Sequence, residues 1–275
     1  MSLKLMYITN NPDVASIAQK CGVDRIWIDL ETYGKEERQK GIDTVKSHHT
    51  IDDIKKIKPF MNESELLVRV NQFNESSINE IDSVIDAGAD IIMLPYWKTI
   101  DEVEGFIKAV NGRCKTTLLL ENKEAVNIID DVIKLFDFDE IHIGLNDLHL
   151  SYGMTFMFEL LANGLVDKLC EKFKAAGIPF GFGGIARLGH GDIKAELIIK
   201  EHYRLGSTRA ILSRSFCDID KTESIGMIDK LFSEEMKRLR DFENDVSSLP
   251  KESLDQNHEM VIRTVEKIVQ DRTGV

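Results

Sequence analysis

Eight short apolar segments alternate with helix-like segments along most of the chain, and this alternation decides more about the fold than any single motif. The apolar segments cover residues 3–9, 24–31, 65–71, 90–95, 115–121, 139–144, 178–184 and 208–216. They are nearly continuous apolar runs, which is typical of parallel strands covered on both faces. A doubly wound open sheet fits less well, because residues 10–13 are Asn-Asn-Pro-Asp rather than a glycine-rich phosphate-binding turn. We therefore predict an α/β fold, a (β/α)8 TIM barrel, which typically takes roughly 250 residues.

The 275 residues fit one barrel domain, 1–246, and a helical tail, 247–275, that begins after a Ser-Ser-Leu-Pro break. Within the barrel we expect a loop at 145–153, a helix at 156–176 and a long last helix at 222–246. The last helix and the tail carry apolar stripes, which are Ile225, Ile228 and Leu231 on one and Val261, Val265 and Ile268 on the other. These stripes predict packing on a neighbouring subunit or across the barrel, or else an ordinary intramolecular helix pair.

Charge and composition exclude several classes of partner. The chain has 35 basic and 47 acidic residues, a net charge of −12, and no basic stripe, which argues against nucleic acid. No apolar run approaches the roughly 18 residues that span a bilayer, and no signal peptide is evident. The four cysteines are far apart and form no Cys-x-x-Cys pair, which argues against disulfides and structural zinc and favours the cytoplasm.

Charged residues stand where the predicted strands stop, which is where barrel enzymes place their catalytic groups. Asp29 and Glu31 end the second strand, Arg69 is near the end of the third, Glu121 ends the fifth, and Asp147 follows the sixth. A charge inside an apolar run needs a partner or a bound ion. Two carboxylates on neighbouring strands suit a hard cation, so Mg²⁺ or Mn²⁺ is predicted. An arginine opposite the metal would stabilise a developing enolate.

Each of these residues also has a structural interpretation. Glu121 alone is consistent with a solvated strand end or a first-turn helix acid. Asp147 alone is consistent with an Asx turn or a helix cap. Arg69 could pair with Glu63 or Glu65. The combination across three strands favours a common site.

Five segments carry a family resemblance in their order and spacing. They are IDLE (28–31), LLVRVN (66–71), IIMLP (91–95), LLLENKEAV (118–126) and IGLNDLHLSYG (143–153). Over about residues 5–216 the chain resembles the HpcH/HpaI aldolase and citrate lyase β-subunit family of pyruvate-type TIM barrels.

The resemblance implies a divalent metal and a role for individual residues. The metal carboxylates of the family match Glu121 and Asp147, and the arginine at the oxo-acid carbonyl matches Arg69. The backbone amides of Asn146 and Asp147 match those that bind the substrate carboxylate, and Gly144 lets the backbone turn close to the ligand. The resemblance also implies a homo-oligomer, in whose aldolase branch a C-terminal helix exchanges between subunits.

The chain departs from the aldolase pattern after the second strand. There the pyruvate aldolases carry a histidine that helps acid–base chemistry, whereas this chain has Thr32, which cannot act as a base near neutral pH. Asp29 and Glu31 remain candidate catalytic residues at this strand end. The possible proton carriers are Glu31, a water on the metal, and His48 or His49 from the long loop.

The resemblance therefore implies a metal-dependent carbon–carbon lyase of the aldolase type, which acts on a 2-oxo acid through a pyruvate-like enolate. Two alternatives stay open, a citrate-lyase-like enzyme acting on an acyl thioester and a non-catalytic barrel that binds a small anion. His149, in the predicted loop at the mouth, is a further candidate for contact with the substrate. We expect the loops 32–49 and 185–192 to select the aldehyde or acyl partner.

Overall fold

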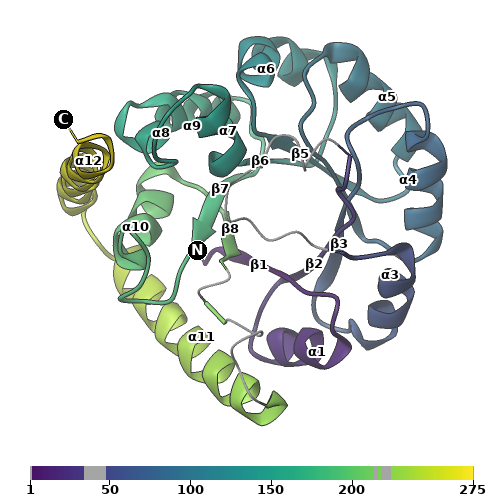
Figure 1. The fold of residues 1–275 in the computed structure, drawn as a ribbon, viewed down its shortest axis with the longest axis horizontal. Helices are drawn as coiled ribbons and strands as arrows, with labels where there is room; N and C mark the ends of the chain where they lie inside the picture. Colours follow the sequence, from purple (N-terminus) through teal and green to yellow (C-terminus); the bar gives the residue numbers. More distant parts are fainter. Residues whose placement is uncertain (1, 34–47, 214–215, 218–223, 275) are drawn as a thin grey trace.

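The computed structural model describes residues 2–33, 48–213, 216–217 and 224–274. Eight parallel strands close into a barrel in sequence order (Figure 1). The strands are β1 (Lys4–Ile8), β2 (Arg25–Asp29), β3 (Glu65–Arg69), β4 (Ile91–Leu94), β5 (Lys115–Leu120), β6 (Glu140–Ile143), β7 (Phe180–Ile185) and β8 (Arg209–Leu212). The predicted TIM barrel with a C-terminal helical extension is confirmed. Residues 214–215 of the predicted last strand lie outside the described residues.

Helices surround the barrel and extend beyond it at the C-terminus (Figure 1). They are α1 (Pro12–Lys20), α3 (Ile51–Ile57), the 3-10 helix η1 (Lys58–Phe60), α4 (Ser77–Asp86), α5 (Ile100–Val110), α6 (Lys123–Leu135), α7 (Leu145–Ser151), α8 (Glu159–Ala162), α9 (Leu165–Ala175), α10 (Ala195–Leu205), α11 (Ile225–Ser247) and α12 (Lys251–Thr273). Residues 222–223 of the predicted long helix, and 34–47 of the predicted long loop, lie outside the described part.

Two helix predictions need correction. The predicted loop at 145–153 contains the helix α7, because Leu145 and Leu148 are spaced to bury one face of a short helix. The predicted helix at 156–176 is divided into α8 and α9, because Gly164 between them has a φ of +76°.

Short polar residues just beyond the strands begin several of the helices. Asn11 precedes α1, and its side chain accepts hydrogen bonds from the backbone N–H groups of Asp13 and Val14. Asn122 Oδ1 accepts the Ala125 N–H at 2.8 Å before α6. These caps satisfy amides that a helix leaves unpaired, so they fix where the chain turns after the strand.

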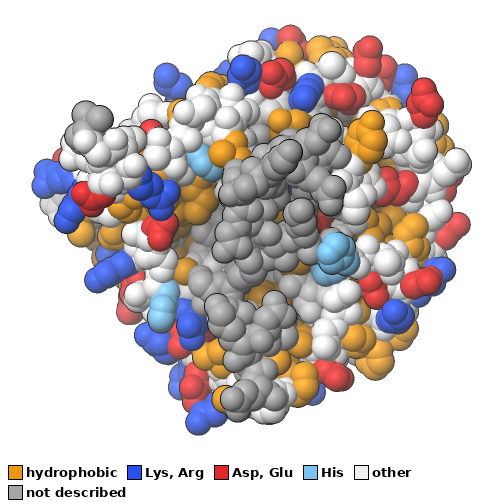
Figure 2. Space-filling view, in the orientation of Figure 1, with side chains coloured by type: hydrophobic (Ala, Val, Ile, Leu, Met, Phe, Trp, Pro, Cys, Tyr) orange, Lys and Arg blue, Asp and Glu red, His pale blue; other side chains and the backbone are white. Residues whose placement is uncertain are grey.

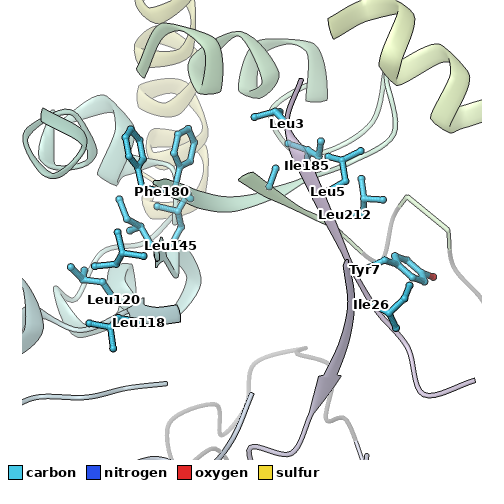
Figure 3. Packing of buried hydrophobic residues seen from close by; sticks show 14 of the residues in the cluster. Leu3, Leu5, Tyr7, Ile26, Leu118, Leu120, Leu145, Phe180, Ile185 and Leu212 are labelled. Carbon is cyan, nitrogen blue, oxygen red and sulfur yellow. The ribbon is translucent and has the colours of Figure 1, made fainter. Parts of the chain in front are cut away.

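The strands separate two hydrophobic clusters. The smaller one fills the barrel interior and consists of Met6, Trp27, Leu67, Ile91, Met93 and Leu119. The larger one lies between strands and helices, and Figure 3 shows part of it, including Leu5 and Tyr7 of β1 and Leu118 and Leu120 of β5. Because side chains alternate across a strand, residues two apart point into the barrel together. The side chains of Asp29 and Glu121 therefore point into the barrel, as those of Trp27 and Leu119 do.

A layer of charged side chains fills the N-terminal end of the barrel interior. The Arg25 guanidinium contacts both carboxylate oxygens of Glu140, and Arg209 Nε donates to Glu140 Oε2 at 2.6 Å. Thr117 Oγ1 donates to Glu140 Oε1 at 2.8 Å. Burial alone would raise the pKa of Glu140, but the hydrogen bonds and charge of Arg25, with the charge of Arg209, hold it below its ordinary value. The buried carboxylate of Glu140 thus balances much of the positive charge of two arginines.

The last helix packs on the barrel of its own chain. α12 lies against α10 and α8, with Val261 and Val265 buried. Asn257 Nδ2 donates to Glu201 Oε1 at 3.1 Å, and His258 Nδ1 is 2.9 Å from Glu201 Oε2. The domain division at residue 246, exchange of the tail between subunits and a homo-oligomer stay predictions. None of the described helices combines the length and apolar character needed to cross a membrane.

Two buried histidines are predicted to make this fold sensitive to acid. The His142 Nε2–H donates to the Gly183 carbonyl at 3.2 Å inside the barrel. The His202 ring stacks on Phe182 with centroids 3.9 Å apart, and its Nδ1 lies 2.8 Å from Ser207 Oγ. Burial lowers the pKa of His142 to about 4. Burial, together with the charge that His142 would carry, lowers the pKa of His202 to about 3.

We expect the free energy of unfolding to fall as the pH drops below about 6.5, the ordinary pKa of histidine. There the unfolded chain binds protons that the folded histidines exclude, which costs about 2 kcal/mol per histidine by about pH 5. Between about pH 7 and about pH 5, the free energy of unfolding should fall by about 2 kcal/mol less in His142→Gln than in the parent, which urea unfolding can measure. His190→Gln removes an exposed histidine and should behave like the parent. The same loss in His142→Gln as in the parent would contradict this assignment.

Candidate active site

The carboxyl ends of the strands form the mouth of the barrel, where barrel enzymes carry their sites. Asp29 and Arg69 are paired in the register of β2 and β3, while Glu121 follows β5 and Gly144 follows β6. Figure 2 views the molecule in the same orientation as the strand ring of Figure 1. On the described part of that face, acidic and basic side chains are interspersed rather than gathered in a basic stripe.

Both acidic residues at the end of β2 contact Arg69. Its Nε and Nη2 each lie 2.8 Å from an oxygen of Asp29, a bidentate pair. Its Nη1 lies 3.3 Å from Glu31 Oε2. The Arg69 side chain is 12% exposed, against 2% for Asp29 and 1% for Glu31. Burial alone would lower the pKa of Arg69, but the charges of Asp29 and Glu31 outweigh it and hold the pKa well above its ordinary value.

The alternative pairing of Arg69 with Glu63 or Glu65 is wrong. Glu65 accepts a hydrogen bond from Arg25 Nε at 3.1 Å and contacts Lys115, and Glu63 is exposed. The reason is geometric, because Glu65 begins β3 and Arg69 ends it. The two residues therefore face opposite ends of the barrel interior.

Glu121 is buried beside the turn at Gly144. The Glu121 side chain is 3% exposed, so its interpretation as a solvated strand end is wrong. Its Oε1 accepts the Tyr96 backbone N–H at 3.0 Å. A Cβ atom added at Gly144 would lie 2.9 Å from Glu121 Oε2, so glycine is needed for this approach. Tyr96 has a φ of +48°, and such backbone strain in a residue other than glycine is typical of functional sites.

The helix α7 starts at the Gly144 turn and carries the second predicted carboxylate. Asp147 is 7% exposed, and Asn146 Nδ2 donates to Asp147 Oδ1 at 3.3 Å. His149 is also buried, and its Nδ1–H donates to the Leu145 carbonyl at 3.2 Å. That nitrogen of His149 is therefore used within α7.

The two histidines of the long loop are placed differently. The structure brings His49 to the end of β2, where its Nδ1 lies 3.1 Å from the backbone nitrogen of Asp29. The His48 side chain is exposed. Of this pair, His49 is the one that contacts a predicted site residue.

Sequence reasoning missed the residues that hold the turn after β2. Asn71 Oδ1 accepts the backbone N–H groups of Thr32 at 2.9 Å and Tyr33 at 3.0 Å. Asn71 Nδ2 in turn donates to Glu80 Oε1 at 2.8 Å. The sequence feature that could have identified Asn71 is its position, because it carries an amide side chain just past the end of the strand with Arg69. The Tyr96 amide on Glu121 was also missed, because a backbone donor has no signature in the sequence.

Glu121 and Asp147 fit a hard divalent cation through the chemistry of their donors. Both are buried carboxylates, and Mg²⁺ and Mn²⁺ prefer oxygen ligands while leaving other positions to water or substrate. Across the described ranges, no group of three or more His, Cys, Asp or Glu side chains is placed to hold a metal ion. Two buried carboxylates alone would leave the other ligand positions of a cation to water or substrate.

A cavity of about 810 Å³ lies at the opposite end of the barrel. Its charged lining residues include Lys58, Glu65, Asp90, Lys115 and Asp139. These groups are already engaged, for example in the 2.6 Å ion pair of Lys58 with Asp90 and the ion pair of Lys115 with Glu65. The buried charges at the strand ends make the mouth, and not this cavity, the candidate active site.

Comparison with known proteins agrees with this architecture. Residues 4–161 match the family model described as HpcH/HpaI aldolase/citrate lyase. A family protein from Burkholderia cenocepacia J2315 shares the fold at 14% identity and a TM-score of 0.59, over 87% of this chain and 94% of that chain. The HpcH/HpaI aldolase from Desulfitobacterium hafniense DCB-2 is 14% identical, with a TM-score of 0.57 over 90% of this chain and 94% of that chain. The citrate synthase SbnG is 17% identical, with a TM-score of 0.54 over 87% of this chain and 94% of that chain. No curated protein matches the sequence. Because the family match spans more than half of the chain, the protein belongs to the HpcH/HpaI aldolase/citrate lyase family.

Proposed function

We propose that the protein is a divalent-metal-dependent carbon–carbon lyase of the aldolase type, which acts on a 2-oxo acid through a pyruvate-like enolate. Family membership supports the reaction class. The observation that carries the proposal is the buried Glu121 carboxylate, which lies against the Gly144 turn that begins the helix with Asp147. Carboxylates at the strand-end mouth that also carries Arg69 would suit an anionic substrate only when a cation joins them.

Glu121 and Asp147 would hold Mg²⁺ or Mn²⁺. The bound ion would supply Lewis-acid polarisation of the keto oxygen. The amides of Asn146 and Asp147 would orient the substrate carboxylate. Asn146 also donates to Asp147 Oδ1 at 3.3 Å, which orients that carboxylate.

Arg69 would stabilise the negative charge that develops on the substrate oxygen. Its Nε and Nη2 are fixed by Asp29, so the guanidinium is oriented before the substrate arrives. Nη1 faces Glu31 at the longer distance of 3.3 Å, and we assign this edge to the substrate. Glu31 is then the carboxylate best placed to move a proton beside Arg69, in the role for which Thr32 is unsuited.

Metal binding provides the first test. Glu121→Gln and Asp147→Asn should each remove tight Mn²⁺ binding in calorimetry, because an amide is a much poorer ligand than a carboxylate for a hard cation. Circular dichroism should show that both variants stay folded. Asp131→Asn, which changes an exposed carboxylate on α6, is the matched control and should bind Mn²⁺ like the parent. Parental Mn²⁺ affinity in the first two variants would overturn the ligand assignment.

Proton exchange provides the test of the reaction. Formation of a pyruvate enolate exchanges the methyl protons with solvent, which proton NMR in heavy water with Mg²⁺ can follow without knowledge of the aldehyde. Exchange that depends on the protein and on Mg²⁺ is expected. Competition by free coenzyme A in a thermal shift assay would favour the acyl-thioester alternative. Absence of exchange with a panel of 2-oxo acids would favour the non-catalytic barrel.

A further inference from the structure

A second cavity lies at the N-terminal end of the barrel, opposite the mouth. It has a volume of about 620 Å³, and the first residues of β1, β7 and β8 line it. Its charged lining residues are Lys4, Lys174 and Arg209, which are all basic. The 810 Å³ cavity differs, because acidic and basic side chains line it together. In a chain with a net charge of −12, three cations around one cavity require an explanation.

Strand pairing places two of these cations side by side. Lys4 and Arg209 are partners in the register of β1 and β8. Because side chains alternate across a strand, Lys4 points to the same side as Met6, which belongs to the cluster inside the barrel. Arg209 also points inward, since its Nε donates to Glu140 Oε2 at 2.6 Å. Two positive side chains are therefore adjacent at this end of the barrel.

Lys174 approaches the same cavity from the end of α9. The chain turns at Gly206, which follows α10 and has a φ of +67°. A Cβ atom added at Gly206 would lie 2.7 Å from Lys174 Cε and 3.2 Å from Lys174 Nζ. The ammonium group of Lys174 therefore lies against the turn that leads into β8. Among the residues that the structure describes, neither Lys4 nor Lys174 forms an ion pair with a carboxylate.

The charged layer inside the barrel also has too few carboxylates on this side. Arg25 contacts Glu65 and Glu140, Lys115 contacts Glu65, and Arg209 contacts Glu140, so three cations share two carboxylates. Burial alone would lower the pKa of Arg25, but Glu140 and Glu65 raise it above its ordinary value. Burial lowers the pKa of Arg209, and the charge of Glu140 does not offset this. Negative charge is therefore deficient beside Arg209.

We infer that this cavity, the anion cavity, binds the phosphate group of a small molecule, either inorganic phosphate or a phosphate monoester. Arg209, whose side chain is 9% exposed, is the buried anchor of the site. Its Nε and Nη2 face Glu140 and its Nη1 donates to Thr208 Oγ1, which fixes the guanidinium. Both Nη atoms carry a further N–H group for a phosphate oxygen. Lys4 and Lys174 would add two more positive charges.

The size and the position of the anion cavity agree with a separate ligand site. A volume of 620 Å³ is within the range of small-molecule sites, roughly 300–1,000 Å³. The six-residue cluster inside the barrel separates this end from the mouth, where Glu121 and Asp147 lie. The inference therefore does not depend on the proposed lyase activity and can be tested without substrate or metal.

Calorimetry of the full chain with inorganic phosphate, at constant ionic strength and without metal, tests the binding. The double variant Lys4→Gln, Lys174→Gln removes two exposed charges and leaves Arg209 and the buried layer in place. It should bind phosphate at least roughly tenfold more weakly than the parent. The control Lys55→Gln, Lys230→Gln removes two exposed lysines elsewhere and should bind like the parent. No binding to the parent, or equal affinity in the Lys4 and Lys174 double variant, would overturn the inference.

Amide NMR shows where the phosphate binds. Gly177 and Gly206 line the anion cavity, whereas Gly144 is at the mouth. Phosphate should shift the amide signals of Gly177 and Gly206 and leave that of Gly144 unchanged. Shifts at Gly144 alone, or equal shifts with chloride at the same ionic strength, would contradict a phosphate site in this cavity. Glycerol phosphate separates the two sources, because tighter binding than phosphate identifies a monoester as the ligand and weaker binding identifies free phosphate.

Discussion

Arg69→Lys is expected to lower the rate of pyruvate proton exchange by about 100- to 1000-fold and to leave Mg²⁺ affinity unchanged. Lysine keeps the positive charge but cannot reproduce the planar fork with which Arg69 engages both Asp29 oxygens at 2.8 Å. It also loses the contact of Nη1 with Glu31 at 3.3 Å and the stacking over Trp27, where the guanidinium carbon lies 5.2 Å from the ring centroid. The charge would remain near the mouth without being aimed at the substrate.

The expected split between rate and metal binding separates this role from a general loss of structure. Glu121 and Asp147 are untouched in Arg69→Lys, so calorimetry should return the parental Mg²⁺ affinity. Arg113→Lys is the matched control, because Arg113 also pairs with a carboxylate, Asp82, at 2.6 Å, but on the surface. That variant should exchange pyruvate protons at the parental rate. An Arg69→Lys protein with parental exchange would remove Arg69 from the proposed chemistry.

The barrel could be predicted from sequence because its evidence is local. Continuous apolar runs such as the one that ends at Glu121 indicate buried strands, and the rule that barrel sites lie at strand ends then selects the charged residues there. These two steps select Glu121, Asp147 and Arg69 from the sequence. They do not identify Asp29 as the partner of Arg69, because Glu63 and Glu65 are closer in the sequence whereas Asp29 is on the neighbouring strand. The strand register pairs Asp29 with Arg69 across 40 residues of sequence, so the pairing cannot be found by looking at the neighbours of Arg69.

Other parts of the site depend on atoms that the sequence does not label. The Tyr96 amide that donates to Glu121 belongs to a residue with a φ of +48°, which no propensity predicts for tyrosine. The contact of His49 with Asp29 joins the end of a long loop to a strand, so sequence distance hides it. The charged layer around Glu140 was missed for a different reason. Its members begin their strands, and a charge at the start of a strand looks in sequence like an ordinary solvated end.

Replacing Glu140 is expected to have the largest effect on stability. Glu140→Ala should lower the free energy of unfolding by about 3–5 kcal/mol, because it leaves two buried guanidinium groups without their shared carboxylate. The side chains of Arg25 and Arg209 are 1% and 9% exposed, so water cannot replace the lost partner. Thr117 Oγ1 would also lose its acceptor, which lies at 2.8 Å. Urea unfolding at neutral pH measures the loss, and Glu140→Gln provides a milder variant if Glu140→Ala does not fold.

The matched control removes a carboxylate from an exposed ion pair instead. Glu104 lies 2.8 Å from Lys108 on α5, with side chains 47% and 71% exposed, and Glu104→Ala should cost about 0.5 kcal/mol or less. A variant with apolar residues at all three buried positions, Arg25→Met, Glu140→Leu and Arg209→Met, should recover most of the stability lost in Glu140→Ala. The large cost comes from buried positive charge that Glu140 no longer balances, although Arg25 keeps its 3.1 Å contact with Glu65. If Glu140→Ala were no more destabilising than Glu104→Ala, the charged layer would not be what holds this end of the barrel together.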